Sequence, residues 1–377
     1  MTEIPGLFGT NWPEPDDVVL LRVLLHADLD VSKRAWSEFA PRWDADAPTS
    51  DQYRLFPILA ERLALIAPDD PRLGMLQGVR RQATIQTMLL LDRLDRVLEL
   101  FESVNIEPIV LKGGALALNL YDNVGQRPAH DLDLAVGPDR FDEARAVLLA
   151  AGWAQTAEDT LGRHAVSFGL DGDEVDLHRQ VNRELVIPGK PLAALQRFDV
   201  VRAERPLRSG RRVRVLNHTD ALVHTIVHGL DRTGATNLRW VVDATRLIGT
   251  GAIDWSRFVE LTKLFGLAPL MHSGLTFVVS VAGVELPADL LSELSAIRLS
   301  PFERARLWAF HVWGPIDGPF RGLPRTISRL LEATRDRTFW GVVAASPAYL
   351  AEVWGASSVW GLPGAVLRKV RRVRSSA

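Results

Sequence analysis

The sequence of 377 residues contains no cysteine. Disulfide bonds, zinc sites built on thiolates and cysteine nucleophiles are therefore excluded together. Any metal site must use oxygen or imidazole ligands, which favours a hard cation such as Mg²⁺. An excess of one charge is also missing, because the chain has 44 Lys and Arg and 46 Asp and Glu. A net charge of −2 provides no overall field for coating a nucleic acid.

The sequence also lacks an uninterrupted apolar run of about 20 residues, which a membrane-spanning helix needs. The closest segment, Phe339 to Leu367, is interrupted by Pro347, Glu352 and Pro363, so it predicts buried helices. The N-terminal segment has neither the basic region nor the apolar stretch of a secretory signal. We therefore expect a cytoplasmic protein without a membrane span.

The chain is 47% hydrophobic and 24% charged, as in ordinary globular proteins, and its length favours two to three folding units. Apolar residues three and four apart predict helices from Asp16 to Asn105, the longest from Arg72 to about Val104. Strand patterns follow, and helical patterns resume after Asn217. The sequence thus predicts an N-terminal helical segment (1–105), an α/β core (106–216) and a C-terminal helical domain (217–377).

Within the core, a short β-rich run over 108–112 leads through Gly113-Gly114 into a helix over 115–121. Residues 131–136 alternate between polar and apolar, which indicates a half-buried strand. The remaining patterns predict a helix over 141–151, a hairpin with strands over 163–170 and 174–178, and short strands over 199–202 and 212–215.

Acidic residues recur on single faces of two of these strands. Side chains at i and i+2 share a face of a strand, so Asp131 and Asp133 point the same way. Glu174, Asp176 and His178 share a face in the same manner. If the two strands are neighbours, three or four carboxylates converge. Such a cluster repels itself without cations, and two Mg²⁺ ions about 3.5–4 Å apart are a known way of using it, in phosphoryl or nucleotidyl transfer.

The glycine pair is suited to bind phosphate. Gly113-Gly114 lies between a strand and a helix, where backbone N–H groups and the helix dipole favour anions. Lys112 and Arg127 are candidates for balancing the remaining negative charge.

The phrase VLKGGALALNLYDNVGQRPAHDLDLAV, followed by His164 and then by EVDLH, resembles a bacterial family of uncharacterised nucleotidyltransferases. This family belongs to the polymerase-β-type nucleotidyltransferase superfamily. The resemblance covers about 108–180 and extends more weakly over 222–248. It implies an α+β fold with a small mixed β-sheet flanked by helices, in which Asp131 and Asp133 bind both metal ions and Asp176 binds the catalytic one.

Two features depart from the family pattern. The interval from Gly114 to Asp131 is longer than in compact members of the superfamily, which affects the placement of Arg127. The third acid is Asp176 where many relatives are expected to have Glu, and Glu174 has the same strand parity. We favour Asp176.

The resemblance predicts a Mg²⁺-dependent nucleotidyltransferase, with Mn²⁺ as the alternative ion. It would move a nucleoside monophosphate from an NTP to a hydroxyl or phosphate of an acceptor and release pyrophosphate. Asp131, Asp133 and Asp176 would be catalytic and would bind the metal; Gly113, Gly114, Lys112 and Arg127 would bind the nucleotide. The acceptor could be a small molecule, a peptide or RNA, any of the four NTPs could serve, and the sequence carries no signal for an oligomeric state.

Two other functions stay open. Glycosyltransferases use an Asp-x-Asp motif to bind a sugar nucleotide through one Mn²⁺, but they generally need a βαβ region before the motif, and this chain is helical there. A non-catalytic nucleotide-binding protein is the other alternative, against which the presence of all three acids argues. The metal hypothesis requires that Asp176 faces the other two aspartates and that no lysine ammonium fills the space between them.

The histidines and the C-terminal tail have plainer interpretations. His164 and His178 are expected to be structural hydrogen-bond partners. His224 and His228 have metal-ligand spacing but no evident third ligand, so we expect a structural role, with a wall of the acceptor pocket as the alternative. The basic run 368–374 is expected to be a solvated tail; contact with anionic lipid or nucleic acid is its alternative.

Overall fold

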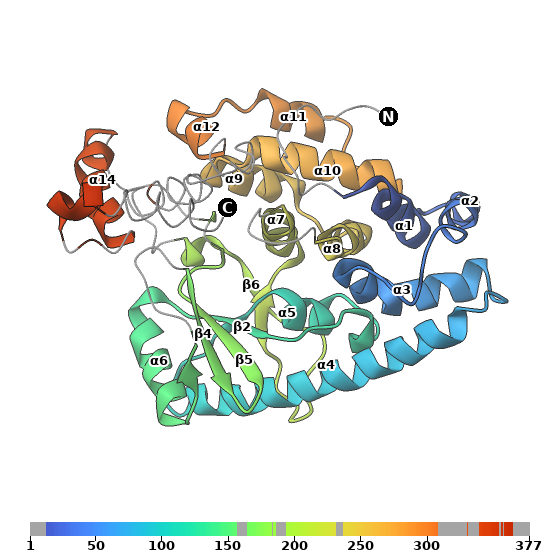
Figure 1. The fold of residues 1–377 in the computed structure, drawn as a ribbon, viewed down its shortest axis with the longest axis horizontal. Helices are drawn as coiled ribbons and strands as arrows, with labels where there is room; N and C mark the ends of the chain where they lie inside the picture. The colour runs from blue at the N-terminus through green and yellow to red at the C-terminus, as the bar shows by residue number, and fades with distance from the viewer. Residues whose placement is uncertain are drawn as a thin grey trace.

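The computed structural model describes residues 13–156, 164–182, 184–185, 194–230, 237–307, 330, 339–353, 356 and 358–364. The basic run 368–374 lies outside these residues. The fold is α+β, as predicted: a seven-stranded mixed sheet lies between two groups of helices (Figure 1). None of the helices in the described ranges combines the length and apolarity needed to cross a membrane.

The helices of the described ranges follow the predicted order. The N-terminal group is α1 (Pro15–Leu25), α2 (Leu29–Phe39), α3 (Ser50–Ile66) and α4 (Leu73–Glu102). The core contains α5 (Lys112–Asn119) and α6 (Phe141–Ala150). The C-terminal group is α7 (His218–Gly229), α8 (Arg239–Gly249), α9 (Trp255–Phe265), α10 (Ala268–Ala282), α11 (Leu290–Ala296), α12 (Pro301–Leu307) and α14 (Phe339–Val353).

The strands are β1 (Ile109–Val110), β2 (Leu132–Ala135), β3 (Ala154–Gln155), β4 (Ala165–Leu170), β5 (Asp173–His178), β6 (Val200–Arg202) and β7 (Arg214–Leu216). Their order in the sheet is β3-β4-β5-β2-β1-β7-β6. β4 and β5 form the predicted antiparallel hairpin. β2 pairs with β5 in parallel and with β1 antiparallel, so the two acidic strands are neighbours near the middle of the sheet.

One face of the sheet packs on α4 and α6. Figure 1 shows the long helix α4 running along this side of the sheet. The alternation of β2 and β5 produces this packing, because every second residue points to the same side. The side chains that form the cluster with α4 are Leu132, Leu134, Val175 and Leu177 from the strands and Leu94, Val97 and Phe101 from the helix. The residues of opposite parity, among them Asp133 and Asp176, therefore point away from α4.

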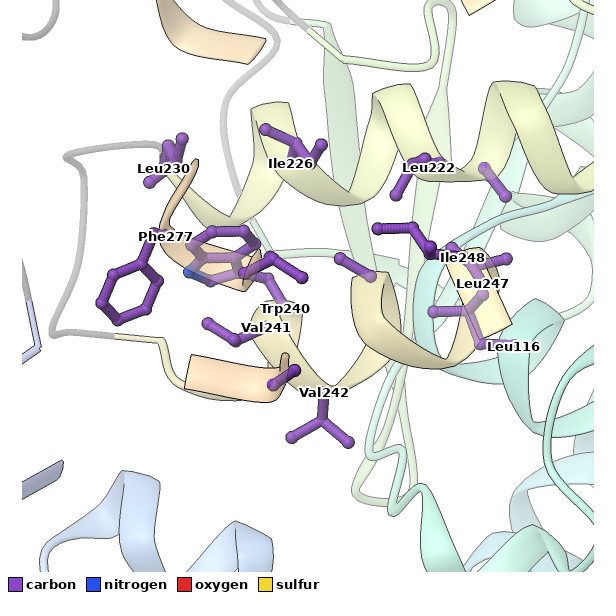
Figure 2. Close-up of a cluster of buried hydrophobic side chains, with 14 of the residues drawn as sticks. Leu116, Leu222, Ile226, Leu230, Trp240, Val241, Val242, Leu247, Ile248 and Phe277 are labelled. Atoms are coloured by element: carbon purple, nitrogen blue, oxygen red, sulfur yellow. The ribbon is translucent and has the colours of Figure 1, made fainter. Parts of the chain in front are cut away.

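A second large core joins the N-terminal group of helices to the C-terminal group. Buried side chains of α1 and α3 belong to the same cluster as those of α7, α8, α9 and α10. Figure 2 shows the part of this cluster in which side chains from α5, α7, α8 and α10 meet. Trp240 packs against Phe277 with ring centroids 6.2 Å apart, and a Cβ at Gly229 would lie 2.0 Å from its Cγ. Glycine is therefore required where α7 crosses Trp240.

Side-chain caps fix where α3 and α7 begin. The Thr49 side chain accepts a hydrogen bond from the Gln52 N–H, and Gln52 reaches back to the Thr49 backbone, which starts α3. The Asn217 side chain accepts one from the Asp220 N–H at 2.8 Å and starts α7. Such caps satisfy donors that the first helical turn leaves free. They fix the start of α7, the helix that carries His224 and His228.

Candidate active site

Asp133 on β2 and Asp176 on β5 lie directly beside each other. The two residues are register partners in the parallel pair of strands. Ligand atoms of Asp133, Asp176 and His178 all lie within 4.8 Å of one another. Asp131 precedes β2 and has the same parity, but it is outside this group, as is the exposed Glu174. The structure thus brings together two of the three predicted aspartates and adds His178.

Three side chains hold these two carboxylates in place. The ammonium of Lys112 forms an ion pair with Asp133 Oδ1, and His178 Nε2 is 3.0 Å from the same oxygen. The Ser167 hydroxyl donates to Asp176 Oδ1 at 2.5 Å. Among the described residues, Lys112 makes an ion pair with Asp133 and with no other acid. The lysine therefore pairs with Asp133, and its charge also acts on Asp131 and Asp176.

Burial and the local charges give the groups of this cluster different pKa values. Burial disfavours the charged form of Asp133, but the charge of Lys112 and the hydrogen bond from His178 outweigh it and hold the Asp133 pKa well below its usual range. For Asp131, burial and then the negative charge of Asp133 raise the pKa. Burial also opposes the charge of Lys112, yet Asp133 and the neighbouring acids raise the Lys112 pKa. The lysine is thus a firmly charged counter-ion to the cluster.

The first turn of α5 lies against β2 and the segment before it. The Leu111 N–H donates to the Asp133 carbonyl at 2.9 Å, and α5 begins at the next residue, three residues earlier than predicted. Lys112 has a φ of 48°, a left-handed conformation that is uncommon outside glycine. A Cβ at Gly113 would lie 2.9 Å from the Ala129 Cβ, while one at Gly114 would meet Val110 at an ordinary 3.5 Å. Gly113 thus permits close contact with the chain that leads into β2.

A family model described as uncharacterised nucleotidyltransferase matches residues 40–283, which is more than half of the chain. The chain belongs to this nucleotidyltransferase family. It is also similar to the crystal structure of an antigenic nucleotidyltransferase-like protein from Paracoccidioides brasiliensis, with a TM-score of 0.35 and 17% sequence identity over 57% of this chain and 92% of that chain. A likeness at this level adds nothing to the assignment. No curated protein matches the sequence.

In this nucleotidyltransferase family member, Arg127 is committed to a buried contact. Its Nε lies 2.8 and 2.9 Å from the two carboxylate oxygens of Asp243 on α8, and Arg127 is only 8% exposed. The hydroxyl of Tyr121, also buried, donates to the same carboxylate at 2.5 Å. Arg127 was predicted to bind the nucleotide. That role stays a prediction; in the structure Arg127 joins the chain before β2 to α8.

The histidines lie around the cluster in two pairs. The rings of His164 and His178 are 5.3 Å apart, and those of His224 and His228 on α7 are 6.0 Å apart. Neither His224 nor His228 belongs to a possible metal-binding group in the described part of the chain. Burial lowers the His228 pKa to about 3 and the His224 pKa well below its usual value, which favours the neutral imidazoles of a structural role.

His224, His228 and Lys112 line a cavity of about 40 Å³ enclosed by α5, α7 and α8. This volume corresponds to about three water molecules, so a nucleotide base does not fit in the cavity as it stands. The Nε2 atom of the buried His224 has no hydrogen-bond partner among the described residues. The cavity places α7 and α8 next to Lys112, on the side of α5 away from α4.

Three residues of this site were not predicted. Ser167 bonds Asp176 across the hairpin, and Asp243 and Arg239 come from α8. Asp243 carried a signal in the sequence, because it is the single acid on a helix face that also bears Trp240 and Leu247. A lone acid on an apolar face requires a buried partner. Arg239 and Ser167 carried none.

Proposed function

We propose that this chain is a Mg²⁺-dependent nucleotidyltransferase that moves a nucleoside monophosphate from an NTP to an acceptor. The acceptor oxygen, from a hydroxyl or a phosphate, would bond to the α-phosphorus. The bond from that phosphorus to the β-phosphate oxygen would break and release pyrophosphate. One observation carries the proposal: Asp133 and Asp176 are in register on adjacent parallel strands, beside the glycine-containing start of α5, in a member of this family.

The donor set fits a hard divalent cation. Asp133 and Asp176 offer carboxylate oxygens within a few ångströms of each other. Asp131 lies two residues before Asp133 and has the same strand parity. Both contacts to Asp133 described above use Oδ1, and no side chain of the described residues reaches Oδ2. These three aspartates would hold the ion, Mg²⁺ or Mn²⁺, which when bound would activate the acceptor hydroxyl and neutralise phosphate charge.

The protein's own groups would position the reactants. Ser167 fixes Asp176, which would orient the acceptor hydroxyl and take up its proton. His178 keeps Asp133 in place through a contact in which both side chains are almost fully buried. Lys112 is close enough to all three aspartates for their charges to raise its pKa. It would exchange its ion pair with Asp133 for the phosphates of the NTP.

The remaining parts of the site would come from α5, α7 and α8. The free N–H groups and the dipole at the start of α5 favour phosphate there, next to Gly113 and Gly114. The helices α7 and α8, which lie beside Lys112, would form the acceptor side. This arrangement accommodates a small molecule, a peptide or RNA as the acceptor.

Nucleotide binding measured by calorimetry tests the proposal. The wild type is expected to bind one of the four NTPs more tightly with Mg²⁺ than with EDTA, and Asp133→Asn and Asp176→Asn are expected to abolish that gain. Glu174→Gln is the matched control, because it removes an exposed acid of the same strand parity. If Asp131→Ala combined with Asp133→Ala binds NTP with Mg²⁺ as tightly as the wild type, the assignment is wrong.

A second assay separates catalysis from binding. Release of pyrophosphate from an NTP, in the presence of a cell extract as the acceptor source, is expected for the wild type and not for Asp176→Asn. A nucleotide-binding protein without activity would release none. A glycosyltransferase would be stabilised against heat by UDP-sugars and not by NTPs.

A further inference from the structure

Arg239 is a positive charge without a carboxylate partner at the first residue of α8. Its Nη1 donates to the Pro128 carbonyl at 2.9 Å, while its buried Nε has no hydrogen-bond partner in the described part of the chain. No acid of the described residues lies within the 4.0 Å of an ion pair. An uncompensated guanidinium in such surroundings is costly, and proteins normally pair it.

A second guanidinium meets Arg239 at the same oxygen. Arg127 Nη1 also donates to the Pro128 carbonyl, at 3.1 Å, so the two cationic groups lie side by side. Arg127 is neutralised by Asp243, and that carboxylate is further occupied by Tyr121. Burial and then the charge of Arg127 lower the Arg239 pKa to about 9. The pair of arginines thus holds one more positive charge than its single carboxylate balances.

The nearby acids are already engaged. Asp51 is within range of the Arg239 charge, but it lies 3.6 Å from Arg54, which is its ion-pair partner. The charges of Asp243 and Asp131 also reach Arg239, and Asp243 is paired with Arg127. The proposed function, on which this step rests, commits Asp131 to the metal ion. Three arginines, 54, 127 and 239, then share two carboxylates. Asp51 pairs with Arg54 and Asp243 pairs with Arg127, so Arg239 has none.

We infer that Arg239 binds a phosphate group of the substrates beside the aspartates that the proposed function assigns to the metal ion. The Pro128 carbonyl that holds the guanidinium is three residues before Asp131 in the chain, which places the site at the entrance to β2. Trp240, the next residue, is packed against Gly229 and Phe277, so the start of α8 is anchored. A planar guanidinium suits phosphate oxygens, and that of Arg239 has a carbonyl on Nη1 and no partner on its buried Nε. The phosphate is either the departing part of the NTP or a group on the acceptor.

Binding of tripolyphosphate in EDTA tests the site without metal, nucleoside or acceptor. The wild type is expected to bind it, Arg239→Met to bind it about tenfold to a hundredfold more weakly, and Arg239→Lys to lie between them. Lys263→Met is the control, because it removes an exposed positive charge on α9 that pairs with Glu293 on α11. Equal affinity of the wild type and Arg239→Met, or no binding by the wild type, overturns the inference.

The melting temperature of the variants without ligand distinguishes a binding role from a structural one, because loss of an arginine that stabilises the fold would lower it. Because Arg239→Met removes a buried cation without a partner, it is expected to melt within about 2 °C of the wild type or above it. A much lower melting temperature that Arg239→Lys restores would show that Arg239 has a carboxylate partner, and the inference would be wrong.

Competition identifies the source of the phosphate. If tripolyphosphate displaces NTP in the presence of Mg²⁺, the site takes the departing phosphates; if both bind together, it takes a phosphate of the acceptor. The failure of the proposed function is a separate result. If tripolyphosphate binding depends on Arg239 but Mg²⁺ does not change the affinity for NTP, the anion site is retained and the metal-dependent transferase is rejected. If Mg²⁺ increases the affinity for NTP but tripolyphosphate binding does not depend on Arg239, the anion site alone is rejected.

Discussion

At the scale of single residues, Lys112 controls the charge of the acid cluster. Its ammonium forms an ion pair with the buried Asp133, and its side chain is only 18% exposed. In the proposed function, a divalent ion would compete with this ammonium for the same carboxylate. The affinity of the cluster for a metal in the absence of nucleotide therefore depends on the lysine.

Replacing Lys112 by methionine is expected to lower stability and to increase the response to metal. Breaking a largely buried pair leaves Asp133 uncompensated, at a cost of about 2–4 kcal/mol. Added Mg²⁺ or Mn²⁺ should then raise the melting temperature of Lys112→Met more than that of the wild type. Thermal unfolding with and without the ion measures both effects. Lys263→Met, an exposed pair, should cost less than about 1 kcal/mol and respond to metal like the wild type.

His228 is expected to make folding sensitive to mild acid. Its pKa is about 6.5 in the unfolded chain and about 3 when folded, because burial disfavours the imidazolium. Between these values the unfolded state binds the proton and the folded state does not, so stability is full above pH 6.5 and falls as the pH drops below it. His228→Gln should reduce the loss between pH 7 and pH 5 by about 1–2 kcal/mol. Denaturation by urea at the two pH values measures this, and parallel pH curves for the two proteins would contradict it.

Single residues also show what the sequence could predict of the site. Parity placed Asp133 with Asp131 on one face of its strand and Asp176 with Glu174 on one face of the other, because alternation is a property of any strand. That the two strands are neighbours in register came from the structure. Arg127 could not be placed in the same way, since its partner Asp243 is 116 positions away in the chain. Pairing across such a distance depends on how α8 packs, which local patterns do not encode.

At the scale of elements, the start of α5 is set by packing. The sequence predicted the helix from Ala115, because two glycines disfavour a helix on their own. The helix begins earlier because Leu111 is fixed to β2 and Gly113 is pressed against Ala129. In the same way, the strand β3 was not predicted, as two residues are too few for a periodic pattern and only pairing with β4 defines it. The longer elements, such as α4 and the β4–β5 hairpin, were predicted to within a few residues.

The two glycines of α5 are expected to respond differently to alanine. Gly113→Ala would force a Cβ to within 2.9 Å of Ala129, and overpacking of this kind costs about 1–3 kcal/mol. Gly114→Ala meets only an ordinary contact at 3.5 Å and should be neutral or stabilising by up to about 1 kcal/mol, since alanine favours the helix. Urea denaturation of the pair measures the difference. Equal effects would mean that the first turn of α5 is free to move away from the chain before β2.

At the scale of the whole molecule, the N-terminal helices α1 and α3 and the C-terminal helices α7 to α10 form one core. This core lies on the face of the sheet opposite α4. Buried residues of α1 and α3 share a cluster with α7, α8 and α10, while the sheet has a second cluster with α4 and α6. The division into segments 1–105, 106–216 and 217–377 stays a prediction. A buried polar link between the chain before β2 and α8 is the pair of Arg127 and Asp243. The candidate site lies where the two cores meet.

This link supplies a test of whether the two cores unfold together. Arg127→Met and Asp243→Leu each leave one buried charge unpaired, so each is expected to cost about 3–5 kcal/mol. The double variant replaces both charges by apolar groups and should be more stable than the sum of the single effects predicts, by at least about 2 kcal/mol. Equilibrium unfolding followed by tryptophan fluorescence and by circular dichroism measures all four proteins. If the cores are one cooperative unit, both signals change in a single transition, and each variant shifts that transition. Two transitions, of which a variant moves only one, would show that the sheet and the helices over it fold as separate domains. The site between them would then depend on how those domains dock.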